Sequence, residues 1–379
     1  MSGAIDFLTN FLPGFLLALA VIAASAVVFP FLMRRVWGFM CDRLGPNRVG
    51  PQGLLQPFAD GLKLFIKEDV TPSQAHKYLF LIAPAVALIT PMLTQVVIPF
   101  SDSYTIANLN IGLIYLVAVG AFSVLGILIA GWASNNKYSL VGGLRAAAQM
   151  ISYEIPLILN IVLVALLTGS LSLNRIVEAQ ETVWFGVVQP LSFIIFIIAG
   201  VAELNRTPFD LPEAESELVS GYNTEYGGMR FAFFAALIEW GNVTVWAMAG
   251  STLFLGGWRG PLFNSPVWLA VKVGIMALVI IWFFSTFPRL QIDQLMSFAW
   301  KVLIPLSLLN VAATSGFILI WPENFLLPTA IFSWSSIALF IILFPSVIRK
   351  VLLRNRLRLL ATRKMTTVIS GTGKGGIRS

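Results

Sequence analysis

The sequence predicts an all-α membrane protein that crosses the bilayer many times. Hydrophobic residues make up 57 % of the 379 residues and charged residues only 11 %, whereas soluble domains have roughly 25 % charged residues. Long apolar runs recur along the whole chain, and they do not alternate between apolar and polar residues as the strands of a membrane barrel would. Composition and run length together therefore predict the polytopic helical class.

Nine apolar runs have about the length that crosses ~30 Å of hydrocarbon. No basic residue precedes or enters the first run, and a signal peptide needs a basic n-region, so we interpret this run as a retained span. We expect one transmembrane domain over residues 1–348 and a basic tail over 349–379. The predicted spans are roughly 11–33, 78–100, 111–132, 146–168, 187–203, 231–256, 267–287, 299–321 and 325–348.

Lysine and arginine gather on one side of this arrangement. They lie mainly in the tail and in the loops over 34–77, 133–145, 204–230 and 288–298. The positive-inside rule therefore predicts an N-terminus outside and a C-terminus in the cytoplasm. The loop over 204–230, which we name the acid-rich loop, then faces the cytoplasm.

The chain has one cysteine, Cys41, and one histidine, His76. A cysteine-ligated iron–sulfur cluster and a bis-histidine haem each need more such ligands. We therefore predict no redox centre and no metal site in this chain.

The first basic loop contains an amphipathic segment. Apolar residues recur at helical spacing between Leu54 and Ile66, with Asp60 and Lys63 between them, and Pro57 suits a first helical turn. The segment is too short and too charged to cross the bilayer, so we expect an interfacial helix. Such a helix is either a plain lipid anchor or the wall of an opening for an apolar substrate.

Acids are rare in this chain, yet six of its 18 fall between Glu203 and Glu225. Two more, Glu154 and Glu239, lie inside predicted spans, where a carboxylate is costly and is a functional candidate. The alternative is a structural hydrogen bond between helices. The clustered acids are Glu203, Asp210, Glu213, Glu215, Glu217 and Glu225.

The expected depth of the acids indicates a path that ends inside the membrane. Glu154 lies eight residues into its predicted span, or ~12 Å, and Glu239 lies at a similar depth. The acids would then form a half-path from the inner surface to mid-membrane, from which protons would leave sideways into another subunit. Close carboxylates also raise one another's pKa toward neutrality, which suits proton exchange.

Four long motifs give the chain a strong resemblance to a known family. The sequence resembles the subunit 1 (H-type) membrane proteins of respiratory complex I, the proton-translocating NADH:quinone oxidoreductase. The resemblance covers nearly the whole chain. The motifs are "DRLGPNRVGPQGLLQPFADGLKLFIKED" (42–69), "WASNNKYSLVGGLRAAAQMISYEIP" (132–156), "AELNRTPFDLPEAESELVSGYNTEY" (202–226) and "PRLQIDQLM" (288–296).

The resemblance implies a protein at the heel of the membrane arm, in an energy-transducing membrane, here the bacterial inner membrane. It implies a bound quinone, such as ubiquinone, as substrate and no covalent cofactor. FMN and iron–sulfur clusters would belong to partner subunits. The implied partners are the peripheral-arm subunits of the quinone site, the small membrane subunits beside the antiporter-like subunits and membrane lipid, with no nucleic acid.

The resemblance also implies roles for individual residues, carried over by motif. The membrane part of the quinone chamber would involve Arg43, Arg48, Phe58, Asp60, Lys63, Arg206 and Phe209. The start of a lateral proton path would comprise Glu154, Glu203, Asp210, Glu213, Glu215, Glu217 and Glu239.

The chain departs from the family pattern at a few positions. Met33 stands where Glu is usual and Phe284 where Arg is frequent, and we interpret this as joint replacement of two charges that face each other. Gln291 and Ile292 replace the usual Arg and Tyr. One extra residue after Tyr226 would turn Glu239 by about 100° unless a π-bulge absorbs it.

Three other functions are alternatives to this one. The chain resembles, within the same superfamily, the matching subunit of a membrane-bound hydrogenase or of a ferredoxin- or F420-linked complex. An independent transporter would show internal repeats and broken helices. A purely structural anchor would tolerate neutral substitution of Glu154 and Glu203.

Overall fold

The computed structural model describes residues 12–102, 104–260, 264–339 and 341–342, and within these ranges it is helical without a strand. Seven helical stretches in this part are long and apolar enough to cross a membrane. The predicted all-α membrane class is confirmed. The predicted fifth and ninth spans coincide with shorter apolar helices over Pro190–Glu203 and Leu326–Leu339, so nine full spans are not confirmed. The basic tail lies outside the described residues.

The long stretches are built from one to three helices each. Short helices lie in the connections: η2 (Pro51–Gly53), α3 (Gln56–Ile66), α8 (Leu173–Glu178), α9 (Phe185–Val188), α11 (Glu215–Leu218) and η3 (Gly221–Asn223). The long stretches and the fifth apolar helix are α2 (Leu12–Met40), α4 (Lys77–Gln95), α5 (Gly112–Ala121) with α6 (Ser123–Ala133), α7 (Lys137–Thr168), α10 (Pro190–Glu203), α12 (Gly228–Ala232) with η4 (Phe233–Ile238) and α13 (Glu239–Phe254), α14 (Pro266–Thr286), and α15 (Ile292–Phe298) with η5 (Ala299–Leu303) and α16 (Ile304–Ile320).

Several predicted boundaries are wrong because helices continue past their apolar runs. The helix predicted to begin at 146 begins at Lys137, where the Asn136 side chain accepts a 2.9 Å hydrogen bond from the Tyr138 backbone and caps the helix. Gly169, with φ 62°, ends it in the left-handed conformation. Glu154 therefore lies farther along its helix than the predicted eight residues.

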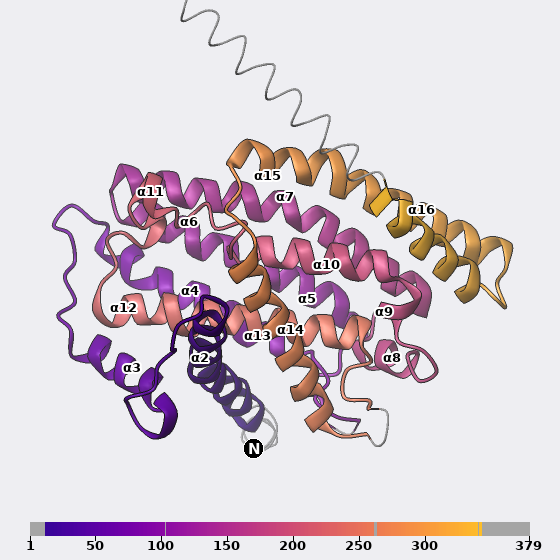
Figure 1. Ribbon diagram of the computed structural model, residues 1–379, viewed down its shortest axis with the longest axis horizontal. Coiled ribbons are helices and arrows are strands. Elements are labelled where there is room, and N and C mark those ends of the chain that lie inside the picture. Colours follow the sequence, from indigo (N-terminus) through magenta and orange to yellow (C-terminus); the bar gives the residue numbers. More distant parts are fainter. Residues whose placement is uncertain (1–11, 103, 261–263, 340, 343–379) are drawn as a thin grey trace, which may run out of the picture.

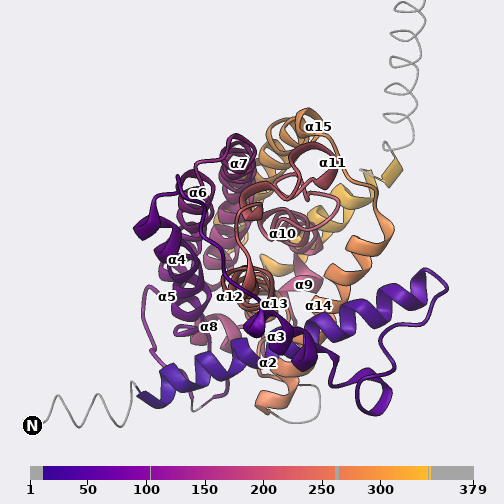
Figure 2. The same ribbon diagram turned by 90° about the vertical axis from the view of Figure 1, so that its left-hand side faces the viewer.

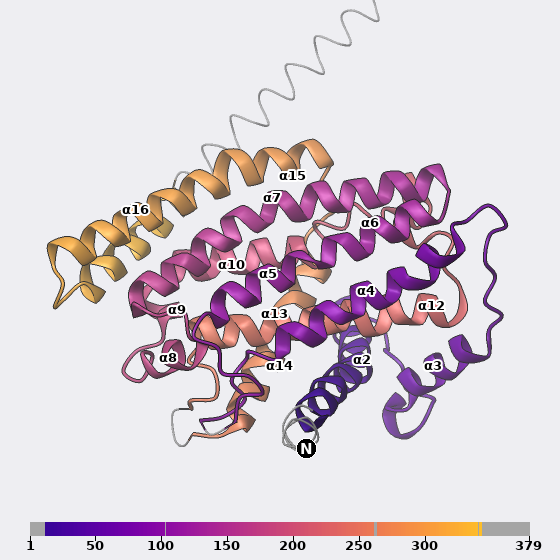
Figure 3. The ribbon, with the colours of Figure 1, turned by 180° about the vertical axis from the view of Figure 1, so that it is seen from behind.

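Helices α10 and α13 form the centre of the bundle. α7 packs against α10, α6 and α16, while α13 packs against α14, α2 and α4. Figure 2 shows α10 and α13 surrounded by the other long helices. In Figure 1, α14 crosses the direction of α7, and Figure 3 shows α3 at the edge of the bundle, where it packs against α12 and α2.

Glycines allow two close helix contacts beside this centre. A Cβ at Gly126 of α6 would lie 2.7 Å from Ala87 of α4, and a Cβ at Gly131 would lie 2.7 Å from the Ser139 carbonyl oxygen of α7. Small residues at membrane helix interfaces let backbones approach and gain van der Waals contact. The α4, α6 and α7 backbones are therefore held close together.

The basic loops meet at one end of the bundle, as the predicted alternation of sides requires. The acid-rich loop and the first residues of α12 make ion pairs with each of the other three basic loops. These pairs are Arg230 Nε–Asp69 Oδ2 at 2.9 Å, Arg145 Nη1–Glu217 Oε2 at 2.5 Å and Arg289 Nη2–Asp210 Oδ2 at 2.7 Å.

Candidate functional site

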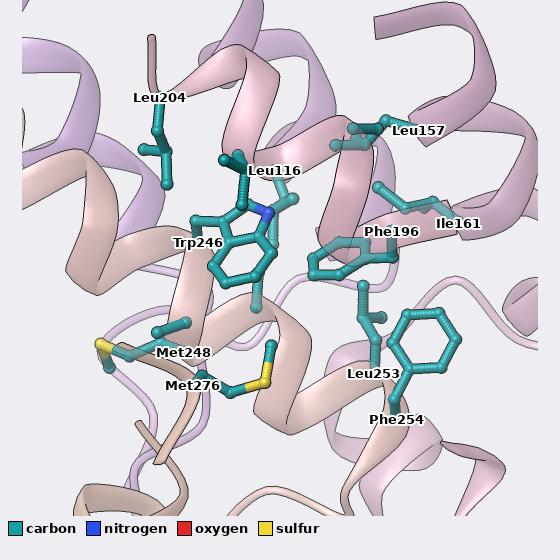
Figure 4. Close-up of a cluster of buried hydrophobic side chains, with 14 of the residues drawn as sticks. Leu116, Leu157, Ile161, Phe196, Leu204, Trp246, Met248, Leu253, Phe254 and Met276 are labelled. Atoms are coloured by element: carbon teal, nitrogen blue, oxygen red, sulfur yellow. The ribbon is translucent and has the colours of Figure 1, made fainter. Parts of the chain in front are cut away.

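A cavity between the central helices contains two of the predicted acids. Glu154 of α7 and Glu203, the last residue of α10, both line it. Its volume is about 80 Å³, and one buried water needs roughly 10–15 Å³ of such space. Figure 4 shows apolar side chains that wall it: Leu116, Leu157, Ile161, Phe196, Leu204 and Trp246.

The two acids have no ion-pair partner and no side-chain hydrogen bond within the described ranges. The Trp246 ring stacks on Phe196 with ring centroids 5.2 Å apart. It lies so close to α10 that a Cβ at Gly200 would be 1.5 Å from its Nε1 atom. Gly200, one helical turn before Glu203, therefore makes room for the indole that walls the cavity.

A second group of acids surrounds Arg206 of the acid-rich loop. Its Nη1 atom lies 2.7 Å from Glu239 Oε1, and the two side chains are 12 % and 22 % exposed. The guanidinium carbon also lies 4.6 Å from the Trp240 ring centre. Such a partly buried pair is favourable only with good geometry and additional contacts, and Trp240 supplies one of them.

Glu213 belongs to the same group. Asn223 Nδ2 donates a 2.9 Å hydrogen bond to Glu213 Oε1. Burial raises the pKa of Glu213 to about 8, and the negative charges of Glu239 and Asp210 add to this, while Arg206 and a hydrogen bond from Tyr222 oppose it. A carboxyl with such a raised pKa holds its proton more readily than an ordinary glutamate and can exchange it near neutral pH.

Gln149 of α7 holds the start of the acid-rich loop. Its Nε2 atom lies 2.7 Å from the Ala202 carbonyl oxygen, 2.8 Å from that of Phe209 and 3.1 Å from Asn205 Oδ1. The Phe209 ring is buried and lies 5.4 Å from the Tyr153 ring, centre to centre. One α7 side chain thus fixes the turn that leads from Glu203 to Arg206. In the sequence, the sign of this role is a glutamine, Gln149, within an otherwise apolar run.

A π-helix, η4 (Phe233–Ile238), immediately precedes Glu239. A π-turn takes up one residue more than an α-turn. The sequence has one residue more than its family before Glu239, and a π-turn can absorb that residue without rotating Glu239. The structure has such a π-segment at this place. The carboxylate after this segment reaches Arg206.

Glu217 and Glu225 lie outside these two groups. Glu217 is half exposed and pairs with Arg145, and Asn136 Nδ2 donates a 2.6 Å hydrogen bond to Glu225. Glu215 begins α11, and its side chain lies outside what the structure describes. In the part of the chain that the structure describes, the predicted acids thus lie in the cavity, around Arg206 or at the loop surface with a partner.

The loop-one helix α3 presents the expected apolar face. Phe58, Leu62 and Phe65 are 55 %, 64 % and 66 % exposed. Asp60 forms an ion pair with Arg34 of α2, which ties α3 to the first span. Burial raises the pKa of Asp60, but hydrogen bonds from Arg34 and Gln56 and the charges of Arg34 and Lys63 outweigh it, so the pKa is lowered.

The predicted quinone residues come from two loops, and their contacts differ. Arg43 is exposed and lies over the Trp37 ring at 5.1 Å, and Arg48 and Lys63 are exposed. Arg206 and Phe209 lie with the acids and with Tyr153 instead. The first loop thus contributes exposed side chains, whereas Arg206 and Phe209 of the acid-rich loop are largely buried.

Two departures from the family pattern have a local explanation. Gln291 is the N-cap of α15 and forms a reciprocal capping box with Gln294. Phe284 of α14 makes an edge contact with Trp37 of α2, with ring centroids 5.2 Å apart. Trp37 lies one helical turn after Met33, so the two positions without family charges lie near one interface.

Among the described residues, no group of three or more His, Cys, Asp or Glu side chains is arranged to hold a metal ion. The arrangement offers two chemical functions. The partnerless carboxyls in the cavity and Glu213 can exchange protons, and the apolar face of α3 can contact an apolar molecule.

Comparison with known proteins identifies the family. The model of the NADH dehydrogenase family matches residues 14–315. The NADH-quinone oxidoreductase H subunit of Dehalococcoides mccartyi (strain CBDB1) is 49 % identical over 318 residues, which cover 84 % of this chain and 90 % of that protein. The protein of the same name from Bacillus thuringiensis (strain Al Hakam) is 51 % identical over 315 residues, covering 81 % and 94 %. The resemblance inferred from the motifs is thus confirmed, and the chain belongs to the NADH dehydrogenase family.

Proposed function

We propose that this chain is the H-type membrane subunit of a proton-translocating NADH:quinone oxidoreductase, that it forms the membrane part of the quinone chamber and that a lateral proton path starts in it. The names of its relatives favour this function over a hydrogenase-type subunit. The observation that carries the proton path is the pair of partnerless carboxyls, Glu154 and Glu203, that share one cavity inside the bundle.

The path would begin at the acid-rich loop. Glu213 has a pKa near 8 and can take up a proton from the inner surface. The Arg206–Glu239 pair lies beside it, and Glu203 stands at the loop's first turn. Protonation of one carboxyl in this region removes a negative charge and so lowers the pKa of the neighbouring carboxyls. The proton affinities of the acids along the path would be coupled in this way.

The quinone would approach along α3. Its exposed apolar residues offer a surface for an isoprenoid tail, and its charged residues Asp60 and Lys63, with Arg43 and Arg48 of the same loop, would contact the polar head group. Arg206 and Phe209 would contribute from the acid-rich loop. One cysteine and one histidine are too few to ligate an iron–sulfur cluster. Electrons would therefore arrive from partner subunits that carry FMN and iron–sulfur clusters.

The proposal includes a location and an orientation. The membrane would be an energy-transducing one, such as a bacterial inner membrane, with the N-terminus outside and the end that gathers the basic loops in the cytoplasm. Peripheral-arm subunits would cover that end. Small membrane subunits beside the antiporter-like subunits would receive the lateral protons.

Substitution of the cavity acids tests the proposal in the assembled complex. Glu154→Gln and Glu203→Gln keep the side-chain size and remove the exchangeable proton. We expect each to lower quinone reductase activity and proton pumping in membrane vesicles while native gels show intact complex. Glu178→Gln, an exposed glutamate of α8, is the control. Full activity in both cavity variants would contradict the proton path.

A further inference from the structure

The cavity that holds Glu154 and Glu203 has a polar lining besides these acids. Thr90 and Thr94 of α4, Ser123 of α6 and Asn242 of α13 all line it. The two threonine hydroxyls donate to backbone carbonyls of their own helix, at 3.5 Å and 2.8 Å. Ser123 is 6 % exposed. Neither it nor Asn242 makes a side-chain hydrogen bond within the described part of the chain, so both have donors and acceptors left for a guest.

Gly120 of α5 opens this cavity. A Cβ built at Gly120 would meet no atom within 4 Å. Leu116 and Val117 lie four and three residues before Gly120, and Ser123 lies three residues after it. All three line the cavity. Residues at this spacing share one helix face. A side chain at position 120 would therefore project into the cavity rather than into a neighbouring helix.

This glycine differs from the packing glycines of the bundle. A Cβ at Gly126 or Gly200 would collide with a neighbouring helix or ring, so packing explains those residues. Packing does not explain Gly120, where a larger side chain fits and would also favour the helix, since glycine is among the least favourable residues in a helix interior. What glycine provides at this position is empty volume.

We propose that Gly120 keeps open a water chamber that connects Glu154 with Glu203, and that Ser123 and Asn242 bind its water. The volume suffices for several water molecules, and a polar, roomy cavity holds water where an apolar one stays dry. One carboxyl gives a proton to the nearest water, and a water at the other end gives a proton to the second carboxylate. One proton is transferred and no electron moves. This inference rests on the proton path proposed above.

A side chain that fills the chamber tests the inference. Gly120→Leu occupies the volume with a good helix former, whereas Gly120→Ser leaves room and adds a hydroxyl. We expect Gly120→Leu to lower proton pumping and turnover roughly tenfold, about 1.4 kcal/mol in the barrier, with the apparent KM for quinone unchanged. Gly120→Ser should keep most of the activity. Gly316→Leu in α16 is the matched control, because a Cβ there also meets no atom within 4 Å.

Two further measurements keep the outcome decisive. Infrared spectra should show slower hydrogen–deuterium exchange of the protonated carboxyls in Gly120→Leu than in the unmodified complex. If that variant does not assemble, Asn242→Leu has a similar size without the hydrogen bonds and should lower pumping in the same way. Full pumping in assembled Gly120→Leu, or in Asn242→Leu, overturns the inference. If the chamber variants are fully active while Glu154→Gln and Glu203→Gln are not, only the chamber fails and the proton path stands.

Discussion

Arg206 Nη1 lies 2.7 Å from Glu239 Oε1, and this ion pair joins the acid-rich loop to the beginning of α13. Both side chains are largely removed from water, and Trp240 covers the guanidinium. The pair therefore fixes the position of the loop relative to the central helix. It also places one positive charge among three acids, which are Asp210, Glu213 and Glu239.

Removing one partner of this pair should destabilise the protein strongly. Arg206→Met leaves the Glu239 carboxylate largely buried without its cation, which costs about 3–5 kcal/mol for a buried pair. Arg206→Met combined with Glu239→Leu removes both charges and should recover part of the loss. Thermal unfolding in detergent measures Arg206→Met, Glu239→Leu and the double variant. If the double variant is as unstable as the sum of the single ones, the two side chains do not stabilise each other.

The stability of the acid-rich loop should fall as pH rises. Glu213 has an ordinary pKa of 4.5 and a pKa of about 8 in the folded protein, so between these values the folded state holds a proton that the unfolded state has released. Its contribution is present below about pH 4.5 and is lost as pH rises through 8. Glu213→Gln should reduce the slope with which the unfolding temperature falls as pH rises over this window. Glu178→Gln should leave the slope as it was, and an unchanged slope in Glu213→Gln would refute the assignment.

The loop-one helix should matter more for long quinones than for short ones. Phe58→Ala removes apolar surface at which an isoprenoid tail would lie, worth about 1 kcal/mol or roughly fivefold in apparent KM. A short-tail analogue does not use that surface, so its KM should hardly change. Phe122→Ala is a matched control, because Phe122 of the third span is 57 % exposed against 55 % for Phe58. Equal effects on both quinones would indicate a lipid anchor.

Met33 and Phe284 should show coupling when charges are restored. Either Met33→Glu or Phe284→Arg introduces an unpaired charge at the α2–α14 contact, with a cost of up to about 3–5 kcal/mol. The double variant can form an ion pair there and should recover part of the loss. A double-mutant cycle on unfolding temperature or assembly isolates the coupling. A coupling energy near zero would show that the two positions do not face each other.

The fold was predictable from the sequence wherever lipid contact determines residue type. Apolar runs located all seven long stretches, but hydropathy reports contact with lipid and not the end of a helix. For this reason the prediction missed the true start of α7 at Lys137, which lies ahead of the apolar run. The predicted fifth span coincides with the helix Pro190–Glu203, which is shorter than the helices that can cross a membrane.

The site was predictable at the level of residue type and not of partner. Glu154 and Glu203 stand out because carboxylates are rare in spans. The partner of Arg206 depends on the path of the loop, which Gln149 sets from another helix. Lys272 of α14 is a similar case, because a lysine near the end of a span commonly extends its ammonium group toward water. Instead it is buried, and its Nζ donates to the carbonyl oxygens of Leu255 and Gly257 at 2.5 Å and 2.8 Å.

The π-helix Phe233–Ile238 has a consequence for comparing this chain with its relatives. Glu239 comes directly after this wide turn and contacts Arg206. The segment can therefore gain or lose one residue by changing between π and α geometry while the acid stays in place. An alignment of homologous sequences should put a one-residue gap within 233–238, so that the glutamates stay in one column.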